Sequence, residues 1–191
     1  MKLALFGYGG HAREVAAQIN QKITFFADDI YANNLIKPIS EFEPEKYKIM
    51  VAVGNSKDRF EIVKKFPKET IFFTWIHPTA IILDDVEIGE GSFIGAYSIL
   101  TINIKIGKHA ILNRSVQIGH DVEIGNYFSA MPGVVVSGNC KIYDYVYIGS
   151  NSSIREKLSV NSFSNIGMNS CVTKNIVKSG TYVGVPSKKI K

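Results

Sequence analysis

The chain has 191 residues, of which 46% are hydrophobic and 20% charged, with a formal net charge of +5. This length allows one medium domain or two small ones, and the hydrophobic fraction is too high for a disordered chain. No apolar run reaches the roughly 18 to 20 residues that cross a bilayer, and the first residues lack a signal-peptide pattern. We therefore expect a folded cytoplasmic protein without membrane insertion, whose two cysteines are reduced thiols.

The excess positive charge gathers near the C-terminus. Residues 76–191 carry 11 basic and 8 acidic side chains, and five of the basic residues follow Thr173. They are Lys174, Lys178, Lys188, Lys189 and Lys191. The excess is thus a C-terminal tail, and this distribution leads us to expect no nucleic-acid partner. A solvated tail and a local site for an anionic ligand both remain open.

Residues 1–75 show the pattern of a small α/β unit. Three apolar runs are each followed by a polar or glycine-rich turn, and a helical spacing follows the first turn. In chain order the segments are 2–6 with Gly7-Tyr8-Gly9-Gly10-His11, the helix 12–21, 23–27 with Asp28-Asp29, and 49–53 with Gly54-Asn55. This β-loop-α-β order with a glycine loop at the first turn is typical of nucleotide binding. A tight turn with surface acids would leave the same pattern.

The size of this unit limits its chemistry. A further helix is predicted over residues 58–65 and ends at Phe66-Pro67, because proline cannot continue a helix. The unit spans about half of a full dinucleotide fold, so NAD-dependent redox chemistry is not expected. We interpret residues 1–75 as a half-Rossmann unit that holds a mononucleotide.

A six-residue repeat fills the second part of the chain, residues 76–191. An aliphatic residue recurs at every sixth position from Ile76 to Val172, which makes 17 hexads, and only Ala130 is not a branched aliphatic. If the aliphatic residue is position one, position two is often glycine and position five is mostly small or β-branched. The strict period of six fits neither a helix nor one long strand, whose periods are about 3.6 and two.

This repeat predicts a short strand and a corner in every hexad. The aliphatic residue points inward, position five fills the remaining interior space, and glycine at position two is expected to allow unusual backbone angles. Three hexads close one coil of 18 residues, and stacked coils pair in parallel about 4.8 Å apart. The pattern resembles the left-handed parallel β-helix of hexapeptide-repeat acyltransferases, over residues 76 to about 186.

A narrower resemblance runs the length of the chain. Its motifs are Gly7-Tyr8-Gly9-Gly10-His11, Asp28-Asp29, Val51-Ala52-Val53-Gly54-Asn55 and Trp75-Ile76-His77-Pro78. Together they are similar to the bacterial nucleotide-amino-sugar N-acetyltransferases and the sialic acid O-acetyltransferases. The resemblance implies a nucleotide-sugar-binding domain at residues 1–75 and an acyltransferase domain with a C-terminal tail at residues 76–191. It implies substrate contacts at Gly9, Gly10, His11, Asp28, Asp29, Gly54 and Asn55.

The main candidate for catalysis is His120, at the third, outward position of its hexad. A three-histidine metal site is not supported, because Gly125 stands where a second histidine would be needed, so we expect no metal. From its position alone, His120 could be a polar corner residue. The family motif Ile-x-His-[Glu/Asp] implies that His120 is a catalytic base and that Asp121 orients its ring. Asp121 could instead be a solvated corner acid.

The chemistry needs a base and a donor for an oxyanion. An amino-sugar nitrogen resembles an α-amino group with a pKa of about 8, so it must lose a proton before it attacks a thioester. Gly138 lies one 18-residue coil beyond His120 and should stack beside it on the same edge. The resemblance implies that the backbone N–H of Gly138 meets the acyl oxygen of the tetrahedral intermediate.

Contacts to acetyl-CoA are implied further along the chain. The stretch from Tyr182 to Lys189 is similar to the Gly-x-Pro-[Ala/Ser]-Lys ending of acetyl-CoA-dependent members, so Lys188 and Lys189 could pair with the coenzyme phosphates. Gly133 ends the family's Asn-x-x-His-x-x-Pro-Gly stretch, in which Ser129 replaces the histidine and weakens any thioester contact there. Asn113 matches a family asparagine near the sugar, although a turn contact explains it equally well.

The resemblance implies an acetyl-CoA-dependent N-acetyltransferase that acts on a UDP- or dTDP-linked 4-amino-4,6-dideoxy sugar, as a homotrimer, in bacterial glycan or O-antigen synthesis. Two alternatives stay open. A sialic acid O-acetyltransferase would use the same class of site on another acceptor, and a non-catalytic nucleotide-sugar-binding scaffold would not need His120. The tyrosines Tyr143, Tyr145 and Tyr147 could pack between subunits or face solvent.

Overall fold

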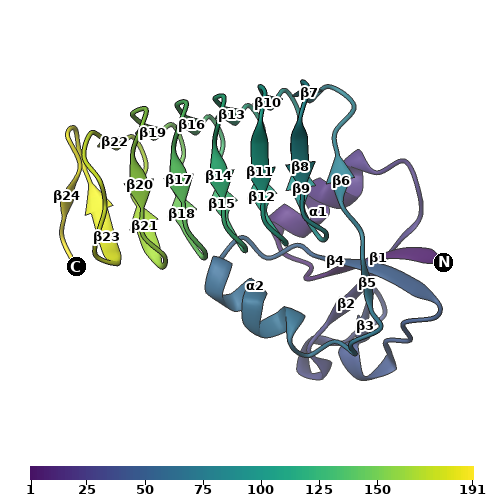
Figure 1. Cartoon of the computed structure of the whole chain (residues 1–191). Helices are drawn as coiled ribbons and strands as arrows, with labels where there is room; N and C mark the ends of the chain where they lie inside the picture. Colours follow the sequence, from purple (N-terminus) through teal and green to yellow (C-terminus); the bar gives the residue numbers. More distant parts are fainter. The chain divides into compact units, whose positions relative to one another are not determined.

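The computed structural model describes all residues, Met1–Lys191, and these form two compact units, Met1–Thr74 and Trp75–Lys191. Figure 1 shows an α/β unit in purple and blue, and a row of short-stranded coils in teal to yellow. Each unit has its own hydrophobic core. Neither unit contains a helix with the length and apolar character needed to cross a membrane.

The first unit is built on a five-stranded parallel sheet with the strand order β3-β2-β1-β4-β5. Its elements are β1 (Lys2–Phe6), α1 (Gly10–Gln18), β2 (Ile23–Ala27), η1 (Asp29–Tyr31), β3 (Ile36–Pro38), η2 (Ile39–Glu41), β4 (Tyr47–Val51), α2 (Ser56–Val63) and β5 (Ile71–Phe72). The chain moves from β1 to β2 and β3 on one side, and then to β4 and β5 on the other. The strand order therefore reverses between β1 and β4, at the edge where open α/β sheets bind ligands.

The three predicted strands of this unit are confirmed, and two short strands are added to them. β1 and β4 each contain a continuous apolar stretch, at residues 3–6 and 49–51, because a parallel sheet buries both of its faces, and Leu5 and Ile49 are fully buried. β3 and β5 have three and two residues, which is too short to leave a periodic signal. α2 begins two residues before its predicted start, because the Asn55 side chain accepts N–H groups from Lys57 and Asp58.

The second unit is the left-handed parallel β-helix that the hexads predict. Its strands form three sheets, with the orders β22-β19-β16-β13-β10-β7, β20-β17-β14-β11-β8 and β24-β23-β21-β18-β15-β12-β9-β6. The strands are β6 (Trp75–Ile76), β7 (Ile81–Ile82), β8 (Val86–Ile88), β9 (Phe93–Ile94), β10 (Ile99–Leu100), β11 (Ile104–Ile106), β12 (Ile111–Leu112), β13 (Gln117–Ile118), β14 (Glu123–Ile124), β15 (Ser129–Ala130), β16 (Val135–Val136), β17 (Lys141–Ile142), β18 (Tyr147–Ile148), β19 (Ser153–Ile154), β20 (Ser159–Val160), β21 (Ser164–Ile166), β22 (Cys171–Val172), β23 (Gly180–Val183) and β24 (Lys188–Lys189). Paired residues are 18 apart, as Leu100, Ile118 and Val136 show, so three hexads form one coil.

The interior of the β-helix is filled from positions one and five of each hexad. Both positions are buried in the stacked coils, for example at Ile94 and Ser98 and again at Ile166 and Ser170. Ala130 is the one small residue at position one, and Phe128 two residues before it is fully buried in the same core. The large ring supplies the volume that alanine lacks, which keeps the interior close-packed.

The corners correct the prediction for glycine. Left-handed backbone occurs at position four, where φ lies between 54° and 60° in 13 non-glycine residues, and at Gly91 and Gly133, where φ is 71° and 73°. The glycines at position two do not have positive φ. They are needed because coils stack closely: a Cβ added to Gly119 would lie 2.7 Å from the Gly138 nitrogen. The expected role of these glycines in unusual backbone angles was therefore wrong.

Gly149 offers a test of this close stacking, away from the candidate site. A Cβ on Gly149 would lie 2.5 Å from the backbone nitrogen of Met168, which cannot move without disturbing the next coil. We expect Gly149→Ala to lower the free energy of unfolding by about 1–3 kcal/mol, as overpacking does, measured by urea denaturation. The control is Arg155→Ala, an exposed position-two residue that already has a Cβ and should change stability by about 0.5 kcal/mol or less. Equal stability of both variants would refute the stacking explanation.

One edge of the β-helix carries a stack of aromatic rings at position four. His109, Tyr127, Tyr145 and Phe163 follow one another in successive coils, with ring centroids 5.1, 5.3 and 4.5 Å apart and interplanar angles of 14° or less. His109 is buried. Tyr145 therefore packs within its own chain, whereas Tyr143 is exposed. The sequence had predicted only packing between subunits or exposure to solvent for these tyrosines.

The hexad register ends after Val172. Val160 pairs with Ile176, and Ser164 with Gly180, so these partners are 16 residues apart instead of 18. The chain then turns back, and β24 pairs antiparallel with β23. The parallel pairing that was predicted to about residue 186 thus continues through β23 to Val183, but the last coil is two residues shorter than the others.

Candidate active site

The candidate catalytic residues lie at one corner of the β-helix, between β13 and β14. Ile118 and Val122 are buried on either side of this corner, so the intervening residues Gly119, His120 and Asp121 lie outside the core. Successive coils place one residue each at position three of this edge. These are Asp84, Ile102, His120, Gly138 and Glu156. The corner therefore presents a row of outward positions, of which His120 is the third.

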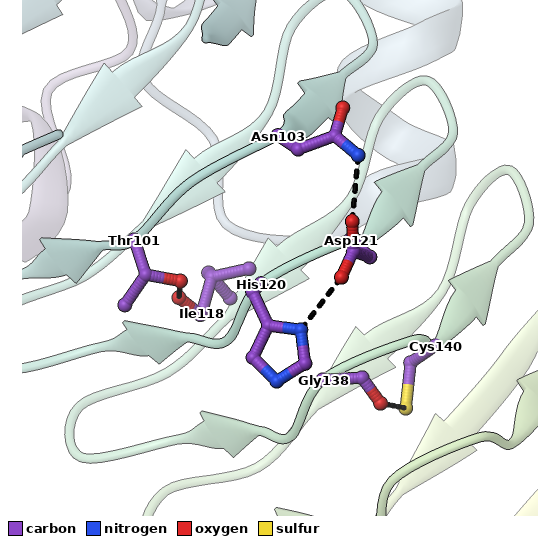
Figure 2. Close-up of polar contacts among 7 residues, drawn as sticks. All are labelled: Thr101, Asn103, Ile118, His120, Asp121, Gly138 and Cys140. Carbon is purple, nitrogen blue, oxygen red and sulfur yellow. Dashed lines mark hydrogen bonds and ion pairs between the residues drawn. The ribbon is translucent and has the colours of Figure 1, made fainter. Parts of the chain in front are cut away.

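His120 and Asp121 form a hydrogen-bonded pair, as Figure 2 shows. The Nδ1 atom of His120 lies 2.7 Å from Oδ2 of Asp121, and the side chains are 56% and 45% exposed. A neutral imidazole that donates its Nδ1 proton to a carboxylate keeps Nε2 unprotonated. The geometry thus leaves Nε2 of His120 as a base that can accept a proton.

Asp121 has a second partner in the preceding coil. The side-chain amide of Asn103 donates to Oδ1 of Asp121 at 2.6 Å (Figure 2). The hydrogen bond from His120, followed by that from Asn103, lowers the pKa of the Asp121 carboxyl below its usual value. Asp121 is therefore a carboxylate over the neutral pH range, as a partner for an imidazolium requires.

Gly138 lies directly beside the His120 ring. A Cβ on Gly138 would lie 2.7 Å from both Cε1 and Nε2 of His120, so the ring leaves no room for a side chain. The other position-three residues of this edge all carry a Cβ, which shows that stacking alone does not demand glycine there. The predicted stacking of Gly138 on His120 is thus present in the structure.

The backbone N–H of Gly138 has no acceptor within the protein. In neighbouring corners the N–H groups at position three are capped by side chains: Lys108 donates to Oδ1 of Asn126 at 2.9 Å, and Asn126 to Oδ1 of Asp144 at 2.6 Å. No such cap or backbone acceptor serves Gly138. A free N–H beside a base is the arrangement that stabilises a developing oxyanion.

The remaining predicted residues of the second unit lie elsewhere. Asn113 lies at the corner after β12, on another edge of the prism from His120, and its Oδ1 accepts the N–H of Arg114. Ser129 is buried in β15. Gly133 occupies a left-handed corner after β15, where a Cβ would collide with the Asn151 side chain. Lys188 and Lys189 form the exposed strand β24, and no hydrogen bond or ion pair joins them to the His120 corner.

The predicted substrate residues of the first unit lie at the carboxyl ends of its strands. Gly9 precedes α1, and Gly10 and His11 open that helix. Asp28 follows β2 and pairs with Lys65, while Oδ1 of Asp29 accepts the N–H of Ser40. Gly54 and Asn55 follow β4, and the Oδ1 atom of Asn55 is used to cap α2. Asn55 thus has a structural contact that the sequence did not suggest.

A cavity of about 480 Å³ opens at this edge of the sheet. Its lining includes Gly7 and Gly9 of the glycine loop, Asp28 after β2, Tyr31 and Ile62. Backbone, acid and aromatic groups thus meet at the end of β1 and β2, which suits a nucleotide better than an extended polymer.

His11 is a titratable group of this unit whose pKa is lowered in the folded chain. Burial is the main cause that lowers its pKa from the ordinary 6.5; Glu14 raises the pKa and Arg59 lowers it further. Below pH 6.5 His11 is therefore protonated in the unfolded chain but still neutral in the folded chain, so the folded state loses stability as the pH falls.

We expect the free energy of unfolding to drop between pH 7.5 and 5.5, and we expect His11→Gln to reduce this drop, measured by denaturant titration. An unchanged pH dependence in His11→Gln would contradict the assignment.

Two residues of the sites were not found from the sequence. Asn103 lies 18 residues before Asp121, so the repeat length could have pointed to it. Arg59 is fully buried, and its Nη1 donates to the carbonyls of Val53 and Gly54 at 2.6 and 3.2 Å, which orders the turn after β4. Arg59 lies in the helix predicted over residues 58–65, and nothing in that sequence marks the arginine as buried. The structure contains no group of three or more His, Cys, Asp or Glu side chains that could hold a metal ion.

Several known proteins are similar to this chain in sequence and fold. Residues 2–66 match the family model described as the PglD N-terminal domain. A GDP-perosamine N-acetyltransferase of Escherichia coli O157:H7 is 28% identical over 174 residues, which cover 80% of this chain and 77% of the relative. WeeI from Acinetobacter baumannii AYE is 27% identical with a TM-score of 0.89, and the match covers 99% of both chains. The acetyltransferase domain of PglB from Neisseria gonorrhoeae FA1090, solved with acetyl coenzyme A, is 27% identical with a TM-score of 0.70, covering 99% of this chain and 98% of that one.

A small α/β unit followed by a β-helix is the fold that this chain shares with the acetyltransferase domain of PglB. The similarities extend over both units of this chain. The first unit thus matches the PglD N-terminal domain, and the chain as a whole is similar to sugar N-acetyltransferases.

Proposed function

We propose that the chain is an acetyl-CoA-dependent N-acetyltransferase for the amino group of a UDP- or dTDP-linked 4-amino-4,6-dideoxy sugar, acting in the bacterial cytoplasm in glycan or O-antigen synthesis. The observation that carries this proposal is the His120–Asp121 pair beside the uncapped N–H of Gly138. A base next to an oxyanion donor is what acyl transfer from a thioester to an amine requires.

In the proposed reaction the sugar amine binds as the uncharged free base, and Nε2 of His120 removes a proton from its nitrogen as that nitrogen attacks the thioester carbonyl. Asp121 stabilises the imidazolium through Nδ1 at 2.7 Å. The carbonyl oxygen becomes an oxyanion, which accepts a hydrogen bond from the Gly138 N–H. The new C–N bond then remains while the C–S bond breaks, and the thiolate of coenzyme A takes the proton from His120. The products are the N-acetylated sugar and free coenzyme A.

The nucleotide is assigned to the cavity at the carboxyl edge of the first unit. The glycine loop and the N-terminus of α1 provide N–H groups suited to a diphosphate. The proposed contacts are Gly9, Gly10, His11, Asp28, Asp29, Gly54 and Asn55, with Asn113 near the sugar. Because Oδ1 of Asn55 caps α2 and Oδ1 of Asn113 accepts an N–H, these two residues would bind substrate through their other polar groups.

Acetyl-CoA is assigned to the β-helix. The proposed contacts are Gly138, Ser129, Gly133, Lys188 and Lys189. The relative from Neisseria gonorrhoeae, which is named as a complex with acetyl coenzyme A, supports this choice of acyl donor. The exposed lysines of β24 suit phosphate groups as point charges.

We further propose that the enzyme is a homotrimer that packs through the outer face of its six-stranded sheet. The outward residues of that face are uncharged: Ile81, Ile99, Gln117, Val135, Ser153 and Cys171. The five-stranded sheet instead presents Glu87, Lys105, Glu123 and Lys141, with ion pairs at 3.9 and 2.9 Å that favour solvent. Light scattering after gel filtration should give three times the chain mass; a monomer mass would contradict the trimer.

A GDP-linked amino sugar is a second candidate acceptor. The Escherichia coli relative that is named a GDP-perosamine N-acetyltransferase matches both units of the chain. The nucleotide base therefore has to be tested directly.

The test mixes the purified protein with acetyl-CoA and a panel of UDP-, dTDP- and GDP-linked 4-amino sugars, and follows release of free thiol. Rapid thiol release with a UDP- or dTDP-linked sugar, absent in the His120→Asn variant, supports the proposal and identifies the nucleotide. Release only with the GDP member favours the second candidate. No release from any nucleotide-sugar would overturn both and make free sialic acid the next acceptor to test.

A further inference from the structure

Asn103 extends the His120–Asp121 pair into a chain of three side chains. Oδ1 of Asp121 accepts the Asn103 amide at 2.6 Å, while Oδ2 faces Nδ1 of His120 at 2.7 Å (Figure 2). A carboxylate only accepts hydrogen bonds, so the amide nitrogen of Asn103 must face it. Each oxygen of Asp121 therefore has one donor, and the plane of the carboxylate is defined from both sides.

This second contact matters because the pair is exposed to water. An exposed ion pair has little strength of its own, since solvent screens it and both side chains lose conformational freedom. Without Asn103, the Asp121 carboxylate would be free to rotate away from the ring. With Asn103 in place, one oxygen is held and the other stays aimed at His120.

The contact is specific to these two coils. Asn103, Asp121 and Asn139 occupy the same corner position in three successive coils, with φ of 54°, 58° and 59°. Asn and Asp accept this left-handed conformation more readily than most residues. The side chain of Asn139 makes no hydrogen bond in the structure, whereas that of Asn103 donates to Asp121. Turn geometry alone therefore does not explain the Asn103 contact.

We propose that Asn103 is a positioning residue for acetyl transfer: its amide holds the Asp121 carboxylate against Nδ1 of His120, which keeps Nε2 free to accept the proton of the acceptor amine. This inference rests on the proposed role of His120 as the base. Asn103 touches no reacting atom and acts only through Asp121.

The experiment compares Asn103→Ala with Asn139→Ala, which removes the same side chain from the same backbone conformation one coil after Asp121. For Asn103→Ala we expect kcat to fall about tenfold, as for one lost hydrogen bond, with KM for acetyl-CoA unchanged. Asn139→Ala should keep wild-type kcat. In Asn103→Asp a second carboxylate faces Asp121, and its negative charge favours the protonated form of the His120 imidazole. The acid limb of the pH profile of kcat/KM should therefore move to higher pH.

A second readout needs no substrate. Long-range ¹H–¹⁵N NMR of the resting enzyme reports which nitrogen of each imidazole carries the proton, and the His120 signal is identified by its loss in His120→Asn. We expect the Nδ1-protonated form in the wild type and in Asn139→Ala, and a mixture of tautomers in Asn103→Ala. A tautomer pattern and a kcat in Asn103→Ala that match those of Asn139→Ala would overturn the inference.

The two readouts also separate this inference from the proposed function. If the wild type acetylates no acceptor but the tautomer changes in Asn103→Ala alone, the positioning contact stands and the proposed reaction fails. If the wild type is active but neither readout distinguishes the two alanine variants, the reaction stands and the role of Asn103 is refuted.

Discussion

Replacing His120 by asparagine is expected to lower kcat for N-acetylation by about 10²- to 10⁴-fold, the usual contribution of a general base. Asparagine can still hydrogen-bond to Asp121, but it has no basic nitrogen to accept the proton of the acceptor amine. The measurement is the rate of thiol release from acetyl-CoA at saturating acceptor. Because the His120 side chain is 56% exposed, the fold should be little disturbed.

His77→Asn is the matched control for this variant. His77 is a half-buried histidine at a corner of the β-helix, and its Nδ1 contacts only the Thr79 hydroxyl and backbone N–H. We expect it to keep the wild-type kcat. If His120→Asn retained activity within tenfold of the wild type, another group would have to be the base.

The second large effect is expected for Gly138→Ala. The added Cβ would lie 2.7 Å from Cε1 and Nε2 of His120, so the ring must swing away from its place between Asp121 and Gly138. A displacement of this kind can cost about 10²-fold in rate. We therefore expect kcat to fall by that factor while the urea midpoint stays near that of the wild type, because the crowded neighbour is a movable, exposed side chain.

Glu156→Ala is the control for Gly138→Ala. Glu156 occupies the same outward position in the next coil and already carries a Cβ. This variant should leave kcat unchanged. An active Gly138→Ala enzyme would mean that the ring position seen beside Gly138 is not the catalytic one.

The repeat in the sequence was sufficient to predict most of the second unit. Aliphatic residues at every sixth position predicted the buried residues, the coil length and the stacking of Gly138 on His120, since all of these follow from one period. The period does not say how the backbone turns. Asp85 and Lys157 adopt the same left-handed corner as Asn103, so no residue type marks that position. The short last coil was missed because Ile176 falls outside the register.

The candidate site was predictable where a motif or the period applied. The motif around His120 and Asp121 indicated the pair, and the structure adds its 2.7 Å contact. The amide of Asn103, the free N–H of Gly138 and the capping of α2 by Asn55 depend on how side chains meet across coils or loops. Such contacts are set by the folded geometry, which hydrophobic spacing does not encode.

The separation of interior and corner in each hexad has a consequence for how this enzyme can change. Ile118 and Val122 maintain the core, while the three residues between them face outward and contribute little to it. Selection can therefore exchange corner residues around His120, and with them the preferred acceptor, at small cost to folding. The β-helix thus combines an interior that is fixed by packing with outward corners that can vary.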